Sequence, residues 1–372
     1  MQAKKSKRSL AAKALVFLMA IAMVFTMMPL DTSSRAYAAS ELQTKTPTLV
    51  VTGQELLTNG AYSAANVGKE KSYTMDELKN LGSGSVVTNQ MYTSKKQKDP
   101  FTKSYYMASG VRIDALVSGL ADVGTNVTIS SSDGYKALFN ETAAYTNDGS
   151  TTVKPGLSGN RYMYDGFEAS NKTEVPSILM WAYKYTEGSN GLPPTEKPTS
   201  ASDKDFLTLC VGQYDDPTGG PEDMNNPLFN KNVNRIQVGD AIDEVVLTVG
   251  TKEYTRADIL LMNFAERTYN YSSSAGDQSD LARGVPMSEL LKGEDGDSTV
   301  SFTAADGYDM SSASKTVNQL IEGNYMLAYE VNGEAVYSTA KKDASKYGFL
   351  TLDGDGEKPS KMINGMSVEA SG

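Results

Sequence analysis

A block that begins with Gly-Val and continues to Asp-Gly-Tyr occurs twice in this chain, and no other feature constrains the fold as strongly. The first copy starts at Gly110, and its Asp-Gly-Tyr glycine is Gly134, 24 positions later. The second copy starts at Gly284 and reaches Gly307 after 23 positions. Two spacings this similar indicate that the chain builds one structural unit twice.

Other segments also repeat, in the same order, in the two halves of the chain. The matching pairs are residues 49–53 with 246–250, 73–78 with 254–259, 205–209 with 347–352, and 232–238 with 362–368. Solenoid repeats recur roughly every 20–50 residues, whereas this period is about as long as a domain. The sequence therefore predicts two tandem globular domains, at residues 45–240 and 243–370.

The N-terminal segment has the pattern of an export signal. Five basic residues precede an apolar run at residues 14–28, which is too short for a stable transmembrane helix. Ala36-Tyr37-Ala38 is a small-x-small cleavage site, so residues 1–38 are predicted to be a signal peptide. We expect a secreted or cell-envelope protein with no transmembrane segment in the mature chain.

Composition excludes several functions. The chain has a net charge of −10, and removal of residues 1–38, which hold six bases and one acid, makes it −15. An acidic chain of this kind repels polyphosphate, so no nucleic-acid partner is expected. The chain has no histidine, which excludes Ser-His-Asp and Cys-His catalysis and His-ligated metals. The single Cys210 excludes an intrachain disulfide, and its apolar surroundings predict a buried thiol.

Local patterns indicate short helices among strands. Thr74 with Glu77 and Thr255 with Asp258 have capping-box spacing, which predicts a helix start in each copy. Apolar spacing predicts a packed helix at residues 111–120. Pro286 is placed for a first helical turn, and alternating strands are expected at residues 127–130 and 300–303. The predicted fold class is α+β, with mixed β-sheets and short helices.

The first copy is longer, and polar segments account for the difference. Residues 147–171, 188–204 and 215–227 are rich in Gly, Pro, Ser or acids and are predicted to be loops. Long loops in compact domains often carry function, so the first copy is the preferred place for a binding site. The acidic stretch at residues 353–355 is interpreted as a solvated turn rather than a calcium site.

Two sets of residues are candidates for ligand binding. Asp133 with Tyr135, and Asp306 with Tyr308, could line a ligand cleft, although Asp-Gly is primarily turn chemistry. In the second set, Trp181, Tyr183 and Tyr185 alternate along an apolar run, which predicts that all three rings lie on one strand face. There they would either stack on a flat ligand or a sugar, or pack in a core.

The repeated motifs resemble the molybdopterin-binding domain of sulfite-oxidase-type oxidoreductases. The resemblance rests on the Gly-Val block, on Asp-Gly-Tyr, on the run Leu-Ala-Tyr-Glu-Val-Asn-Gly-Glu at residues 327–334, and on residues 232–236. It implies two tandem domains of that fold and makes molybdopterin a possible cofactor, with Arg112 on its phosphate. The family holds molybdenum through a Cys upstream of the Gly-Val block, and residues 86–92 and 264–270 contain none.

Three functional hypotheses follow. The first is an exported, non-catalytic tandem-domain protein that uses this fold to bind a protein or a small molecule at the cell envelope. The second is a molybdopterin-dependent oxidoreductase with an atypical metal site, in which Arg112 would meet the pterin phosphate. The third is a surface carbohydrate or adhesion module, since the polar loops and the 21 tyrosines suit contact with glycans. Whether the chain is an enzyme is left open by its sequence.

Overall fold

The structure is a computed structural model of the 372-residue chain. It describes residues 42–53, 71–96, 102–118, 120, 126–140, 146–147, 152–155, 157, 161–168, 170–189, 191–214, 229–239, 245–336, 338–339, 347–348 and 350–370. The predicted signal peptide and its cleavage site lie outside these residues. We call the described residues up to 239 the first half and those from 245 the second half.

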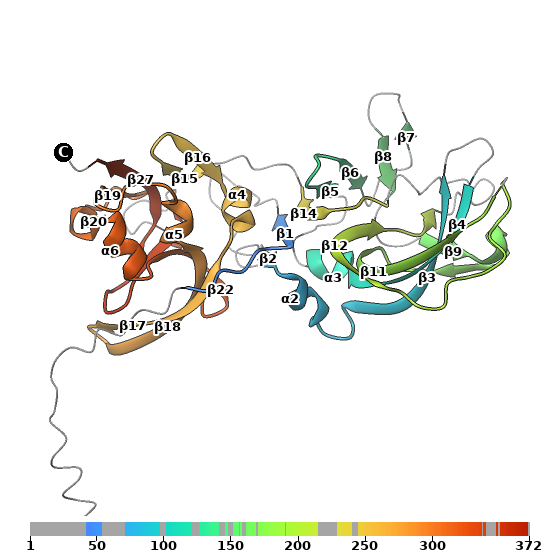
Figure 1. Cartoon of the computed structure of the whole chain (residues 1–372), viewed down its shortest axis with the longest axis horizontal. Helices are drawn as coiled ribbons and strands as arrows, with labels where there is room; N and C mark the ends of the chain where they lie inside the picture. The colour runs from blue at the N-terminus through green and yellow to red at the C-terminus, as the bar shows by residue number, and fades with distance from the viewer. Residues whose placement is uncertain are drawn as a thin grey trace, which may run out of the picture. The chain divides into compact units, whose positions relative to one another are not determined.

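The predicted α+β class is wrong, because the described chain is predominantly β (Figure 1). Its five α-helices have only four to six residues each, whereas several strands run for nine to eleven. The helices are α2 (Met75–Lys79), α3 (Ile113–Val117), α4 (Arg256–Leu261), α5 (Met287–Leu290) and α6 (Val317–Glu322), with 3-10 turns η1 (Asp165–Phe167) and η3 (Ser311–Ala313). Capping signals mark where a helix starts, but they do not set its length.

The predicted helix at residues 111–120 shows how the error arose. Its first two residues end strand β4, and only Ile113–Val117 is helical. Strand β4 is buried on both faces near its end, so its apolar residues do not alternate. A continuous apolar run of this kind cannot be told from a buried helix by periodicity alone.

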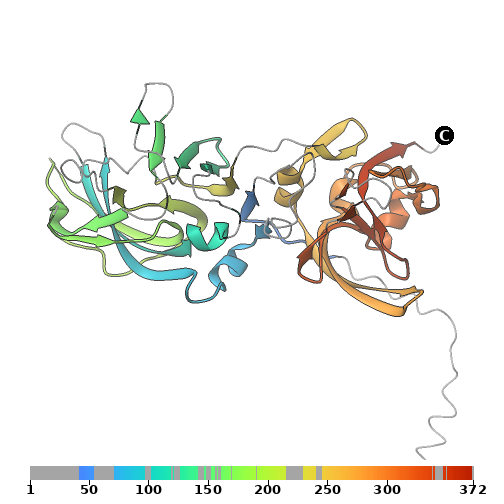
Figure 2. The same ribbon diagram turned by 180° about the vertical axis from the view of Figure 1, so that it is seen from behind.

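The first half contains three sheets. The seven-stranded sheet has the order β2 (Lys71–Tyr73), β1 (Leu49–Gly53), β14 (Val233–Val238), β5 (Asn126–Ser131), β6 (Lys136–Asn140), β8 (Thr152–Pro155) and β7 (Thr146–Asn147). The four-stranded sheet has the order β12 (Asp203–Cys210), β11 (Ile178–Glu187), β4 (Thr102–Arg112) and β3 (Val86–Lys96). The three-stranded sheet has the order β10 (Lys172–Glu174), β9 (Arg161–Tyr164) and β13 (Gln213–Tyr214). Strands β3 and β4 run side by side in both ribbon views (Figure 1 and Figure 2).

The second half contains two larger sheets and a small one. The five-stranded sheet has the order β16 (Lys252–Thr255), β15 (Val245–Val249), β27 (Ile363–Glu369), β19 (Thr299–Ala304) and β20 (Lys315–Thr316). The six-stranded sheet consists of β17 (Ala265–Ser273), β18 (Gly276–Pro286), β21 (Met326–Val331), β25 (Thr351–Asp353), β26 (Ser360–Lys361) and, beside β21, β22 (Glu334–Ala335). Strands β23 (Ser338–Thr339) and β24 (Tyr347–Gly348) pair with each other.

The two halves share a strand order. The order β2-β1-β14-β5 recurs as β16-β15-β27-β19, and both include a parallel central pair, β1 with β14 and β15 with β27. Likewise β12-β11-β4-β3 recurs as β25-β21-β18-β17. The domain boundaries at 45–240 and 243–370 stay a prediction.

Close backbone packing explains the glycine of each Gly-Val pair. Gly110 lies opposite Met180, and Gly284 lies opposite Ala328, each next to a register shift in the ladder. A Cβ on either glycine would collide with the carbonyl oxygen of Leu179 or Leu327. The repeated block is therefore a packing requirement of the sheet, which only glycine meets.

The local turn and capping predictions are confirmed. Thr74 and Thr255 both accept a hydrogen bond from the backbone of the third helical residue, whose carboxylate accepts one from the threonine backbone. Pro286 directly precedes α5. The predicted strands appear as β5 and β19.

The loop predictions have mixed outcomes. Residues 152–155 and 161–164 form strands β8 and β9 inside residues 147–171, so the continuous loop expected there is wrong. Strand β9 pairs with β10 and with the more distant β13, and no local sequence pattern predicts such pairing. The loop expected at residues 188–204 is confirmed for its described residues up to 202, and β12 begins at Asp203. Residues 215–227 lie outside the described residues.

Candidate functional site

A cavity of about 190 Å³ lies on the four-stranded sheet of the first half. Strands β4, β11 and β12 and the segment at residues 229–231 line it, with Tyr106, Met180, Tyr183, Tyr185, Thr208, Phe229 and Lys231. We call this the aromatic cavity. An engineered cavity of about 150 Å³ in another protein binds benzene, so this volume suits a six-membered ring with a small substituent.

The sheet register brings these residues together. Tyr185 is the direct cross-strand partner of Tyr106, and Met180 is the partner of Thr208. Lys231 forms an isolated antiparallel bridge to Thr208. Directly opposed residues of antiparallel strands project to the same face, so each pair contributes two neighbouring side chains to one wall.

The rings are packed against each other rather than splayed. The Tyr106 and Tyr185 rings are stacked, with centroids 5.2 Å apart and planes 19° apart. Phe229 lies 4.6 Å and Tyr183 lies 6.2 Å from the Tyr106 ring, between centroids. Tyr185 is 49% exposed, so the cavity opens to solvent on its side. A preorganised aromatic wall of this kind offers a ligand ring a stacking surface without further side-chain ordering.

The expectation that Trp181, Tyr183 and Tyr185 share one strand face is wrong for Trp181. Strand β11 has a register shift between Met180 and Ala182, which places the extra residue Trp181 in a β-bulge. Trp181 packs with Ala182 in the main core of the first half, whereas Tyr183 packs with Met180 in the cluster beneath the aromatic cavity. Of the three aromatic candidates, Tyr183 and Tyr185 line the cavity, whereas Trp181 packs in the core.

A buried hydroxyl in the aromatic cavity lacks a partner. Thr208 is 1% exposed, and its Oγ1 has no hydrogen-bond partner in the described structure. Its side chain lies beside the Tyr183 hydroxyl, and this interaction lowers the pKa of Tyr183 against the larger effect of burial. An unsatisfied buried hydroxyl costs about 1–3 kcal/mol, which a ligand that hydrogen-bonds to it would recover.

The hydroxyls of Tyr106 and Tyr183 remain protonated near pH 7. Burial, followed by the nearby Cys210 thiol, raises the pKa of Tyr106. Burial, followed by Tyr185, also raises the pKa of Tyr183. Both groups therefore act as neutral hydrogen-bond donors or acceptors and not as bases near pH 7.

The prediction that Cys210 is a buried thiol is confirmed. Cys210 ends β12 and is fully buried in the cluster that also contains Tyr92 and Tyr106. Burial raises the pKa of its thiol well above the ordinary value. A buried thiol that resists ionisation is a poor nucleophile and a poor metal ligand.

The Asp-Gly-Tyr residues form exposed turns away from the four-stranded sheet. Asp133 Oδ1 accepts a hydrogen bond from the Tyr135 backbone N–H, at 3.2 Å, in the turn between β5 and β6. Asp306 Oδ1 accepts the equivalent bond from Tyr308, at 3.1 Å, after β19. Both tyrosine rings are exposed. In both turns the Asp side chain stabilises the chain reversal, so these residues form structural turns rather than a ligand cleft.

Arg112, the candidate for a pterin phosphate, has a carboxylate partner. Its Nε and Nη2 donate to the two carboxylate oxygens of Asp114, at 3.0 and 2.5 Å. These hydrogen bonds raise the pKa of Arg112, which stays charged. A phosphate would have to displace a bidentate partner two residues away.

The described residues do not fit molybdopterin. The only thiol is fully buried and resists ionisation, and Arg112 is already paired. In the described ranges, no three His, Cys, Asp or Glu side chains are placed to hold a metal ion. The described residues therefore do not support molybdopterin chemistry in this protein.

Comparison with known proteins places the chain in no family. No protein-family model matches it, and no curated protein does. In the parts of the chain that the structure describes, no helix combines the length and apolarity needed to cross a membrane.

The second half carries different chemistry at the place that corresponds to the aromatic cavity. Asp280 lies four residues before Gly284, as Tyr106 lies four before Gly110. Asp353 pairs with Met326 in the way that Cys210 pairs with Ile178. Asp280 accepts hydrogen bonds from Tyr271 and Asn332, whereas Asp353 Oδ2 is buried without a partner.

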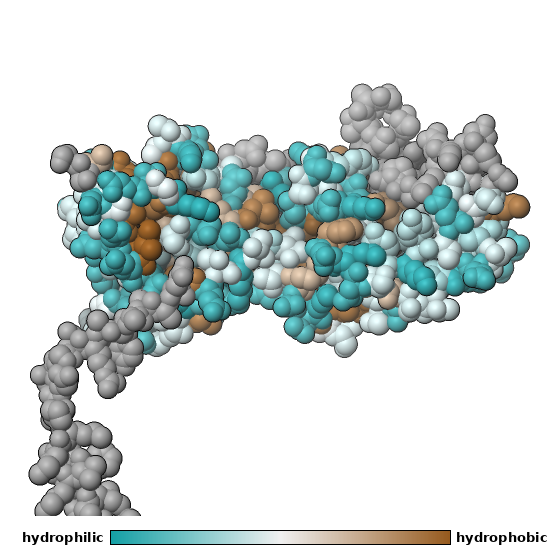
Figure 3. All heavy atoms as spheres, in the orientation of Figure 1, coloured by the Kyte–Doolittle hydropathy of each residue, from teal (hydrophilic) through white to brown (hydrophobic). Residues whose placement is uncertain are grey.

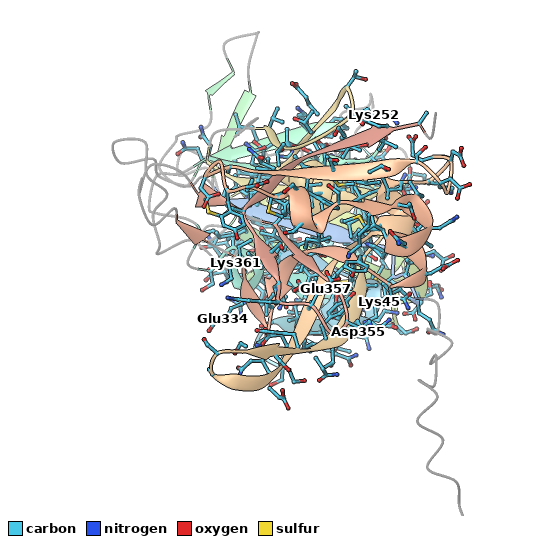
Figure 4. All side chains as sticks on the ribbon, turned by 90° about the vertical axis from the view of Figure 1, so that its left-hand side faces the viewer. Lys45, Lys252, Glu334, Asp355, Glu357 and Lys361 are labelled. Atoms are coloured by element: carbon cyan, nitrogen blue, oxygen red, sulfur yellow. The ribbon has the colours of Figure 1, made fainter. Side chains whose placement is uncertain are left out.

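Asp353 contradicts the interpretation of residues 353–355 as a solvated turn. It is 2% exposed, and burial, followed by the charge of Asp280, raises its pKa to about 7. Gly354 is buried as well, whereas residues 355–358 are exposed, and Figure 4 labels Asp355 and Glu357 there. Asp355 pairs with Arg267, and Glu357 pairs with Lys315.

The surface offers no broad apolar alternative on the face shown in Figure 3. There the apolar groups form separate patches within a mainly hydrophilic surface. The aromatic cavity therefore remains the best candidate site in the described chain. Sequence reasoning missed Tyr106, Thr208, Phe229 and Lys231, which only strand pairing brings together. The adjacent tyrosines Tyr105 and Tyr106 were the available signal in the sequence.

Proposed function

We propose that this chain is an exported, non-catalytic protein that binds a small ring-containing molecule in the aromatic cavity of its first half. The observation that carries the proposal is the combination of stacked rings with the buried, unpartnered hydroxyl of Thr208. The N-terminal signal pattern supports export to the cell envelope or beyond. Binding, rather than catalysis, is favoured because the lining, as far as the structure describes it, offers no carboxylate, thiol or imidazole as nucleophile or general base.

Ligand-observed NMR on the full mature chain tests this proposal. The probes are phenol, benzyl alcohol, benzoate and N-acetylglucosamine, each at millimolar concentration. Thr208→Leu fills the cavity and removes its hydroxyl, and Tyr185→Ala removes the exposed part of its wall. Because Tyr185 is half exposed, the second variant should fold even if the first does not. Tyr308→Ala, at an exposed tyrosine of the second half, is the matched control.

We expect at least one ring compound to bind, Thr208→Leu and Tyr185→Ala to weaken it, and Tyr308→Ala to leave it unchanged. Saturation by the sugar alone would favour the carbohydrate hypothesis at the same cavity. If none of the four probes binds, or if both cavity variants bind as the wild type does, the proposed function is wrong.

A further inference from the structure

The described lining of the aromatic cavity has four hydroxyls, which can donate or accept, and one charged group, which only donates. Its described lining has one ammonium, at Lys231, and the hydroxyls of Thr208 and three tyrosines, with no carboxylate or side-chain amide. Ammonium groups only donate hydrogen bonds. A neutral sugar presents several hydroxyls that must also donate, and carboxylates or amides usually accept those bonds. Because the one charged group of the described lining, the Lys231 ammonium, only donates, the cavity favours an anionic ligand that accepts.

Two of the donors are adjacent. The antiparallel bridge between Thr208 and Lys231 places their side chains on the same face, and both line the cavity. The hydroxyl is buried and unpartnered, while the lysine is exposed. A planar group with two acceptor oxygens can take a hydrogen bond from each.

The lysines near the aromatic cavity also favour an anionic ligand. Lys231 makes no ion pair with the described residues. A second ammonium, that of Lys204, lies 4.9 Å from the centroid of the Tyr183 ring. In a chain whose net charge is −10, these two lysines place positive charge beside the stacked rings, where the Glu187 carboxylate also acts on Tyr106. Positive charge beside an aromatic surface recruits anions that carry a ring.

We propose that the ligand of the aromatic cavity is a six-membered-ring carboxylate, with its ring against Tyr106 and its carboxylate between Thr208 and Lys231. This inference rests on the proposed function, which requires only that some ring compound binds. Its added content is the carboxylate and the two groups that recognise it.

Isothermal titration of the full mature chain with benzoate and with benzamide tests the inference. The two probes have the same ring and nearly the same shape, but benzamide lacks the charge. The variants are Lys231→Gln, which removes the charge, and Lys231→Arg, which keeps it. Lys252→Gln, at a lysine in the turn region of β15 and β16, is the matched control.

The wild type should bind benzoate about three- to tenfold more tightly than benzamide, as expected for one partly exposed charge-assisted contact. Lys231→Gln should remove this preference without weakening benzamide, while Lys231→Arg and Lys252→Gln should retain it. Equal affinities in the wild type, or an unchanged preference in Lys231→Gln, would overturn the carboxylate assignment and leave the proposed function intact. Failure of both probes, together with phenol, benzyl alcohol and N-acetylglucosamine, would reject the proposed function itself.

Discussion

Replacing Arg283 with methionine should destabilise the folded chain more than any ordinary surface change. Arg283 is 5% exposed on β18, in the second half, yet its main partners belong to the first half. Its Nη1 and Nη2 donate to the two carboxylate oxygens of Glu77, at 2.7 and 3.1 Å. Nη2 also donates to the Ser72 carbonyl oxygen, at 2.9 Å, and the guanidinium lies 4.1 Å from the Phe264 ring.

The expected loss is about 3 kcal/mol. Removing one partner of a buried ion pair typically costs about 3–5 kcal/mol, because the other charge is left uncompensated. The expected loss lies at the low end of this range because the Glu77 side chain is 32% exposed, so water can replace part of the lost interaction. Arg283 Nε is itself buried without a partner, so its removal relieves a small cost. Loss of the hydrogen bond to the Ser72 carbonyl and of the cation–π contact increases the expected loss of stability.

Arg267→Met is the matched control. Like Arg283, Arg267 pairs with a carboxylate and lies over an aromatic ring. Its pair with Asp355 is more exposed than the pair of Arg283 with Glu77. Exposed pairs contribute about 0–1 kcal/mol, so this variant should lose less than about 1 kcal/mol. Urea unfolding followed by circular dichroism and by the fluorescence of Trp181 gives both values, and coincident curves would justify a two-state fit. Equal losses in the two variants would refute the reasoning from burial.

Three further outcomes are expected. For Asp353, the folded-state pKa of about 7 lies above the unfolded value, so stability falls as pH rises from about 4 to 7. Asp353→Asn should therefore match the wild type near pH 4 and exceed it by about 2–4 kcal/mol at pH 8 in urea unfolding; an equal difference at both pH values would contradict this. Gly284→Ala should cost at least about 2 kcal/mol because its Cβ meets the Leu327 carbonyl, whereas Gly82→Ala, with open space around it, should stay within about 0.5 kcal/mol; thermal unfolding of both would show whether close packing decides. The Cys210 thiol should react with a thiol reagent such as dithionitrobenzoate only on unfolding, since it is fully buried and its pKa is raised; fast labelling of the folded chain would show that it is accessible.

Sequence alone determined the features that depend on neighbouring residues. The capping boxes at Thr74 and Thr255 need only a hydroxyl and an acid three positions apart. The Asp-Gly turns need only a glycine with positive φ, as Gly134 and Gly307 have. The repeated block and the burial of Cys210 also follow from local pattern.

Tertiary structure decided the fold class and the candidate site. The strands that line the aromatic cavity are spread over residues 102–210, and their register sets which side chains meet. One inserted residue, Trp181, shifts the alternation of β11 and sends two neighbouring aromatic side chains to opposite sides of the sheet. Because the side-chain period of a strand is two, a single bulge reverses every assignment beyond it. The sequence pattern does not show where that bulge lies, since pairing with β4 and β12 fixes its position.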